Sequence, residues 1–148
     1  MFKKICRRTM RGFLLSGMFL AVTLAADDAA IVARDGWLRQ PSESMTEAAI
    51  YVVIENHTAQ RRSIVSGTSE IANKVEMHEM KMDHMLMRMT PVRKVDIPAR
   101  GKATFEPNEL HIMLFGLKKR PMAGDTVTVT LTLDDGTMVP VTATVRKN

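Results

Sequence analysis

The chain has almost no thiol. Its 148 residues include a single cysteine, Cys6, which lies close to the N-terminus. A disulfide framework needs pairs of cysteines, and a cysteine nucleophile needs a thiol within the folded domain. A blue-copper electron-transfer site also needs a cysteine thiolate. The sequence therefore excludes these three classes for a domain that begins after the first residues.

Long apolar runs are also missing. The longest, residues 13–24, has about a dozen residues, whereas a membrane-spanning helix needs about 20. It follows a basic segment and precedes Ala25 and Ala26, an order typical of a secretory signal peptide. We predict a leader over residues 1–26, cleaved on export to the periplasm, and one domain over residues 27–148. An uncleaved membrane anchor is the alternative; after cleavage we expect no stable membrane insertion.

The domain also lacks an excess of charge. The whole chain carries 21 Lys+Arg and 16 Asp+Glu, a formal net charge of +5. Five of the basic residues and none of the acidic ones precede residue 12, which leaves 16 of each sign. A neutral domain offers no electrostatic reason to bind nucleic acid, and we expect none to bind. Because no nucleophile-and-base pattern or glycine-rich phosphate loop is evident, we do not expect an enzyme.

What the sequence does contain is a series of short segments typical of β-strands. Turn residues separate segments that are rich in β-branched residues or alternate with period two, and such spacing is typical of an all-β antiparallel β-sandwich or barrel. We expect a loop over residues 67–73 and a hairpin turn over residues 81–84. A helix over residues 70–89 is the alternative, because methionine is a good helix former. The predicted strands cover residues 31–39, 48–55, 62–66, 74–80, 85–92, 95–97, 102–105, 110–115, 126–133 and 138–145.

Methionine is abundant, and six of the thirteen lie within residues 77–89. Methionines at alternate strand positions are usually flexible core fillers, so we expect most of this run to pack in the core. We also expect Trp37 and Tyr51 to be core aromatics. The turn residue His84 is an open case: it could form an auxiliary metal site with nearby methionines, but an exposed turn is the favoured interpretation.

Four residues form a more specific pattern, with the spacing His78-x10-Met89-x21-His111-x-Met113. Alternate residues of a strand share a face, so His111 and Met113 should point the same way. Imidazole and thioether donors together suit a soft monovalent metal such as Cu(I), whereas zinc rarely uses methionine. Histidine binds a metal only when neutral, so binding should weaken below about pH 6.5.

A carbonyl or carboxylate group should orient each ligand ring. Glu76, Glu79 and Asp83 lie near His78 in the sequence, and the sequence does not choose among them.

These residues give the chain a resemblance to the periplasmic copper chaperones of the PCu(A)C type. The resemblance implies a cupredoxin-like fold and one Cu(I) held by His78, Met89, His111 and Met113. It also implies delivery of copper to the copper centre of a respiratory oxidase during assembly. The spacing of the four residues coincides with the metal motif of that family. The resemblance extends over residues 35–39, 49–56, 75–79, 87–92, 110–117 and 124–131.

The expected partner is therefore a copper-accepting oxidase subunit or another copper carrier, and the expected state is a monomer. Two other functions remain open. The same site could sequester periplasmic copper without a delivery partner, or the methionine-rich strands could form a metal-free interaction module.

Overall fold

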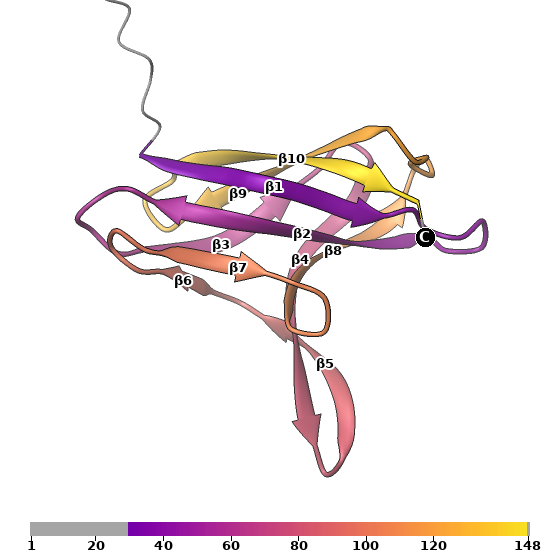
Figure 1. The fold of residues 1–148 in the computed structure, drawn as a ribbon, viewed down its shortest axis with the longest axis horizontal. Coiled ribbons are helices and arrows are strands. Elements are labelled where there is room, and N and C mark those ends of the chain that lie inside the picture. The colour runs from indigo at the N-terminus through magenta and orange to yellow at the C-terminus, as the bar shows by residue number, and fades with distance from the viewer. Residues whose placement is uncertain (1–29, 148) are drawn as a thin grey trace, which may run out of the picture.

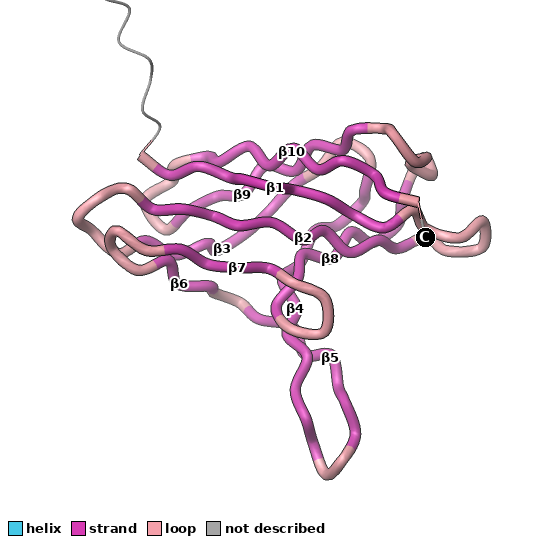
Figure 2. Tube along the Cα trace, viewed as in Figure 1, coloured by secondary structure: helices cyan, strands magenta, loops and turns pink. Residues whose placement is uncertain are grey.

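The computed structural model describes residues 30–147, so the predicted leader over residues 1–26 lies outside the described residues. Figure 2 shows that strands make up most of the described chain. No helix able to span a membrane occurs in the part of the chain that the structure describes. The strands are β1 (Ile31–Arg39), β2 (Glu47–Asn56), β3 (Arg62–Thr68), β4 (Ala72–Asp83), β5 (Leu86–Val92), β6 (Val95–Ile97), β7 (Lys102–Phe105), β8 (Leu110–Leu117), β9 (Thr126–Leu133) and β10 (Met138–Arg146).

The strands form one continuous sheet in the order β5-β4-β8-β2-β1-β10-β9-β3-β6, and β7 pairs with β2. The sheet curls until β3 returns to the side of β4, which encloses a single core (Figure 1). The predicted all-β, cupredoxin-like fold is confirmed. One pairing differs from the antiparallel expectation: β1 and β10 run parallel, with Trp37 opposite Thr144. This pairing joins the first and the last strand of the domain.

Period-two alternation builds the core. In β10 every second residue is buried, and β9 and β2 follow the same pattern. Burying one such aliphatic side chain contributes about 1.5–3 kcal/mol relative to leaving it exposed. Strand alternation therefore decides which face of the sheet becomes the core and which stays outside. Fully buried side chains include Leu38, Ile50, Ile54, Ile64, Ile112, Leu114, Leu131 and Val141.

A β-bulge interrupts β1. The register of β1 against β2 shifts between Arg34 and Trp37, and Asp35 within this segment has a positive φ of 55°. At Gly36 a side chain would have no room, because a Cβ would lie 2.3 Å from the carbonyl oxygen of Thr142 on β10. The bulge thus lets β1 lie closely against β10.

The β4–β5 hairpin projects from the body of the molecule (Figure 1). Within the described chain β4 pairs with β8 only as far as Glu79, and beyond that point it pairs with β5 alone. The two strands reach Asp83 and Leu86, so the turn is the two-residue His84–Met85, not residues 81–84 as predicted. Both turn residues have positive φ, 45° and 67°, as a type I′ turn requires. The alternative helix over residues 70–89 is wrong.

Two further predictions need correction. The loop expected over residues 67–73 is shorter, because β3 extends to Thr68 and β4 begins at Ala72. The methionine run does not mostly pack in the core. Since the hairpin extends past the sheet, Met82, Met85 and Met87 are exposed.

Candidate metal site

Three neighbouring strands, β5, β4 and β8, carry the four predicted ligand residues. His78 on β4 lies directly opposite His111 on β8, while Met89 on β5 lies opposite Met80, two residues along β4 from His78. Met113 lies two residues from His111 and opposite Glu76. Alternation then places all of these side chains on one face of the sheet, the face away from the core. The structure therefore brings together on one face residues that are up to 35 positions apart in sequence.

His111 is oriented by the chain next to it. Its Nδ1 lies 2.9 Å from the carbonyl oxygen of Glu109, so the N–H donor of the ring is at Nδ1. In that tautomer Nε2 carries a lone pair, and Nε2 lies 3.2 Å from the sulfur of Met89. The lone pairs of the nitrogen and the sulfur are thus adjacent, as two donors to one metal ion would be.

His78 is oriented by a carboxylate. Its Nε2 lies 2.9 Å from Oε2 of Glu76, whose other oxygen lies 3.0 Å from Nζ of Lys74. The hydrogen bond with His78, followed by that with Lys74, lowers the pKa of Glu76 below its ordinary value. Glu76 therefore stays ionised and accepts a hydrogen bond from Nε2–H of His78.

The second nitrogen of His78 has no partner. Nδ1 is buried and makes no hydrogen bond, and it is the sole buried side-chain nitrogen or oxygen in this condition among the described residues. Leaving a buried acceptor unsatisfied costs about 1–3 kcal/mol. A buried nitrogen without a partner is unusual in a folded protein, and a metal ion bound at that nitrogen would explain it.

Burial differs between the four residues. His78, His111 and Met113 are each 6–7% exposed, whereas Met89 is 46% exposed. The two imidazole rings lie 6.2 Å apart at their centroids, and the ring of Phe115 lies 5.5 Å from that of His78. Three residues thus form a buried floor, and Met89 forms an accessible rim.

Sequence reasoning left the orienting groups undecided, and the structure selects one of the three candidates. Glu76 contacts His78, while Glu79 pairs with Lys81 at 2.9 Å and Asp83 pairs with Arg88 at 3.1 Å. The signal was available, because among the three only Glu76 shares a strand face with His78. The Glu109 carbonyl was not predicted as an orienting group. Every residue has a backbone carbonyl, so residue identity does not indicate which one contacts a histidine.

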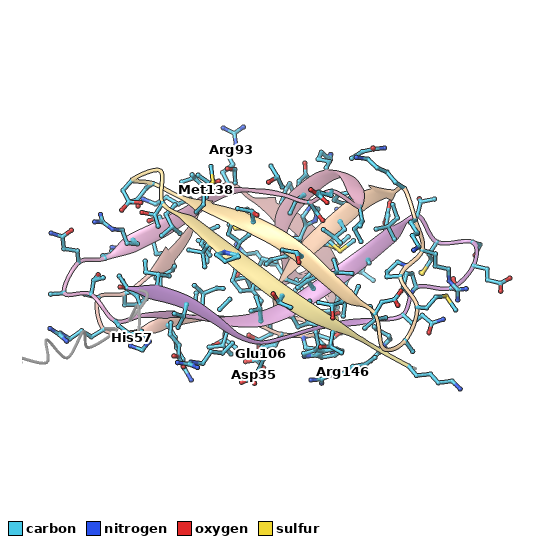
Figure 3. All side chains as sticks on the ribbon, turned by 90° about the horizontal axis from the view of Figure 1, so that it is seen from above. Asp35, His57, Arg93, Glu106, Met138 and Arg146 are labelled. Atoms are coloured by element: carbon cyan, nitrogen blue, oxygen red, sulfur yellow. The ribbon has the colours of Figure 1, made fainter. Side chains whose placement is uncertain are left out.

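Trp37 and Tyr51 are neither core residues nor ligands. Their rings lie 4.6 Å apart on the outer face of β1 and β2, both partly exposed, and the guanidinium of Arg146 lies 4.6 Å from the ring centroid of Trp37. Arg146 and Asp35 lie at one edge of the molecule, opposite Arg93 and Met138 (Figure 3).

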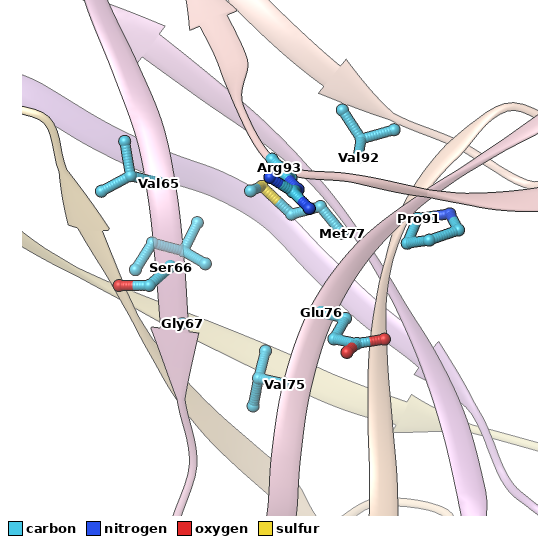
Figure 4. A pocket seen from close by; sticks show the side chains of 10 residues that line it. Val65, Ser66, Gly67, Val75, Glu76, Met77, Pro91, Val92 and Arg93 are labelled. Atoms are coloured by element: carbon cyan, nitrogen blue, oxygen red, sulfur yellow. The ribbon is translucent and has the colours of Figure 1, made fainter.

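A cleft of about 500 Å³ lies beside the site, between β3 and β4. Figure 4 shows its lining, which includes Glu76, Met77 and Arg93. The cleft does not include either predicted histidine ligand, so it adjoins the site without containing it. Within residues 30–147 no cluster of three or more His, Cys, Asp or Glu side chains is arranged to hold a metal.

Comparison with known proteins identifies solved structures that are similar to this chain. A solved structure described as "Copper-bound PCuAC domain from PmoF2" matches with a TM-score of 0.68 and 21% identity, over 80% of this chain and 94% of that one. The Cu(I) form of DR1885 from Deinococcus radiodurans matches with a TM-score of 0.58 and 30% identity, over 86% and 84% of the two chains. The predicted resemblance to PCuAC domains is confirmed.

A curated relative and a family model match as well. The relative, "Putative lipoprotein Lxx21020" of Leifsonia xyli, is 30% identical over 111 residues, which is 74% of this chain. The chain spans 66% of that relative's length, just under two thirds. The family model described as "Putative lipoprotein LpqE-like" matches residues 31–145, nearly the whole described domain. The chain therefore belongs to the LpqE-like family.

Proposed function

We propose that this protein is an exported copper chaperone that carries one Cu(I) between His78, Met89, His111 and Met113. The observation that carries the proposal is the unpartnered, buried Nδ1 of His78, on the same sheet face as the adjacent His111 Nε2 and Met89 sulfur. Each ring is already held through its other nitrogen, which is how metal-binding histidines are usually oriented. The similarity to PCuAC domains, including the Cu(I) form of DR1885, supports the same metal.

The donor set favours Cu(I) in particular. Two neutral imidazoles and two thioethers offer no negative charge, which suits a soft monovalent ion better than zinc. The negative charge of Glu76 lies beside the His78 ring, which its carboxylate holds through Nε2 without joining the ligand set.

Release follows from the same arrangement. Thioethers are weaker donors than thiolates, and Met89 is the exposed member of the set. An acceptor would displace Met89 first and then draw the ion from the buried floor by exchanging one ligand at a time. The acceptor is a copper-accepting oxidase subunit or another copper carrier in the periplasm, as the family resemblance implies.

The binding proposal is tested by titrating the purified exported protein with Cu(I) under reductant while recording its melting temperature. Copper at 100 times the dissociation constant adds about 2.7 kcal/mol of stability, or roughly 10 °C in a domain of this size. Substituting both thioether ligands, Met89→Leu plus Met113→Leu, should remove most of this shift. Matched controls are Met122→Leu and Met138→Leu, which alter exposed methionines outside the three site strands. No shift in the native protein, or an equal shift in the double variant, would refute the proposal.

Delivery and sequestration predict different phenotypes for a strain from which the gene is deleted. Delivery predicts that a deletion strain loses oxidase activity and recovers it with added copper, whereas sequestration predicts copper sensitivity. The accessible rim at Met89 favours delivery, since a storage site gains nothing from an exposed ligand. A metal-free interaction module predicts that His78→Ala leaves function intact.

A further inference from the structure

The projecting hairpin carries more thioethers than the proposed site uses. Met82 on β4 lies directly opposite Met87 on β5, and Met80 lies directly opposite Met89. We refer to Met80, Met82 and Met87, the three that have no part in the proposed site, as the methionine ladder.

The ladder lies on the same face of the hairpin as the proposed site. Met80 and Met82 follow His78 at alternate positions of β4, and Met87 precedes Met89 at the alternate position of β5. Opposite side chains on paired strands have Cβ atoms about 4.5–5.5 Å apart, and diagonal neighbours are within reach of long side chains. The flexible methionine side chain can therefore bring three sulfurs around a common point.

Exposure argues against packing as the role of these residues. Met82 is 66% exposed and Met87 is 48% exposed, so neither contributes much to the core. Their apolar surface is solvated at the far end of a hairpin that projects from the body (Figure 1). The fold gains little from thioethers at these positions.

Charge on the hairpin is confined to the other face. Lys81 pairs with Glu79 at 2.9 Å, and Arg88 pairs with Asp83 at 3.1 Å. These four residues alternate with the ladder residues and so point away from them. A monovalent cation at the ladder would meet no cationic side chain on its own face.

We infer that the methionine ladder is a second site for a soft monovalent metal, Cu(I) or its analogue Ag(I), weaker than the histidine site. The inference rests on the proposed function, because it has the metal ion move between the ladder and the histidine site. Met89 lies beside Met80 on one side and against His111 Nε2 on the other, so the ladder runs directly into the histidine site. The ion keeps its oxidation state and moves by exchanging one thioether for the next donor.

Three sulfurs without an imidazole make a weaker ligand set than the four donors of the histidine site. The ladder should therefore fill after that site and empty before it. Met82 and Met87 are exposed, as Met89 is, so an incoming donor or acceptor can also reach the ladder directly.

The test is a titration of the purified exported protein with Ag(I) under a competing chelator, read by NMR of 13C-labelled methionine methyl groups. The first equivalent should shift Met89 and Met113, and a second, weaker equivalent should shift Met80, Met82 and Met87. In Met82→Leu plus Met87→Leu the second equivalent should be lost while the affinity for the first is unchanged. The matched control is Met138→Leu, an exposed methionine outside the hairpin, which should retain both.

The outcomes are distinguishable. A single equivalent that shifts Met89 and Met113 alone overturns the ladder and leaves the proposed function standing, as does a second equivalent retained in the ladder variant. In His111→Ala the ladder should still bind its equivalent, with the affinity of the weaker site. If the native protein binds metal at the ladder and nowhere else, the ladder stands and the proposed function fails.

Discussion

Replacing His78 with leucine should make the metal-free protein more stable. The substitution removes the buried Nδ1 that has no hydrogen-bond partner, which relieves a cost of about 1–3 kcal/mol. It also removes the hydrogen bond to Glu76, but that carboxylate keeps Lys74 at 3.0 Å and is 35% exposed, so water can replace the lost donor. Subtracting about 1 kcal/mol for this bond leaves a net gain of about 1 kcal/mol. The melting temperature of the metal-free form should rise by roughly 3–5 °C.

His111→Leu is the matched control, because each nitrogen of His111 has a neighbouring atom, the Glu109 carbonyl oxygen at Nδ1 and the Met89 sulfur at Nε2, whereas Nδ1 of His78 has none. The change removes the Nδ1 donor from the Glu109 carbonyl, which retains the backbone N–H of Met80 at 3.1 Å. The expected loss is about 1 kcal/mol. The free energy of unfolding should therefore rise by about 1 kcal/mol in His78→Leu and fall by about 1 kcal/mol in His111→Leu. Both variants should lose the stabilisation that copper provides.

The assay is denaturant-induced unfolding of both variants and the native protein in excess Cu(I) chelator, followed by the same measurement with Cu(I). Equal destabilisation in His78→Leu and His111→Leu would show that the His78 nitrogen is not an unsatisfied group. The reasoning that links its burial to metal binding would then fail.

Three smaller predictions concern stability. Met85→Gly should stabilise the hairpin by up to about 1 kcal/mol, because glycine adopts the positive φ of 67° without a Cβ penalty; an unchanged or lower melting temperature would contradict this. Gly36→Ala should cost about 2 kcal/mol or more, since its Cβ would meet the Thr142 carbonyl oxygen at 2.3 Å, and a melting curve like that of the native protein would count against the bulge geometry. The Ser63 hydroxyl, followed by Arg61, lowers the pKa of Asp96, so its stabilising effect is complete above the ordinary carboxyl range and is lost as pH falls through the lowered value. Asp96→Asn should therefore lower stability at pH 7 and flatten its decline in acid, and a pH profile parallel to that of the native protein would refute the assignment.

Local sequence pattern was enough for most of the strands and for the face of the site. Residues 126–133 alternate so regularly that their strand begins and ends where predicted, and the strand over residues 31–39 also has the predicted bounds. The same rule put His111 and Met113 on one face, opposite Ile112 in the core. Both features depend on residues that are close in sequence and on the burial of one strand face. Alternation of apolar and polar residues indicates that face directly.

The failures concern features that depend on distant segments. The exposure of Met82 and Met87 follows from the point at which β8 stops pairing with β4, and nothing within residues 77–89 records that point. The turn was misplaced because His84–Met85 contains no glycine or asparagine, the usual residues at positive φ. The parallel pairing of β1 with β10 joins residues more than 100 positions apart, beyond the reach of any local pattern.

The parallel pairing of β1 with β10 has a consequence for the order in which the domain can fold during synthesis. β1 needs β10 along one of its edges, so the sheet stays incomplete until residue 146 has emerged. Contacts of such long sequence separation form slowly and keep a nascent chain open. By contrast, the strands that carry the histidines and Met89 are all present by residue 117. The order of synthesis thus delays closure of the domain until its final strand, β10, has been made.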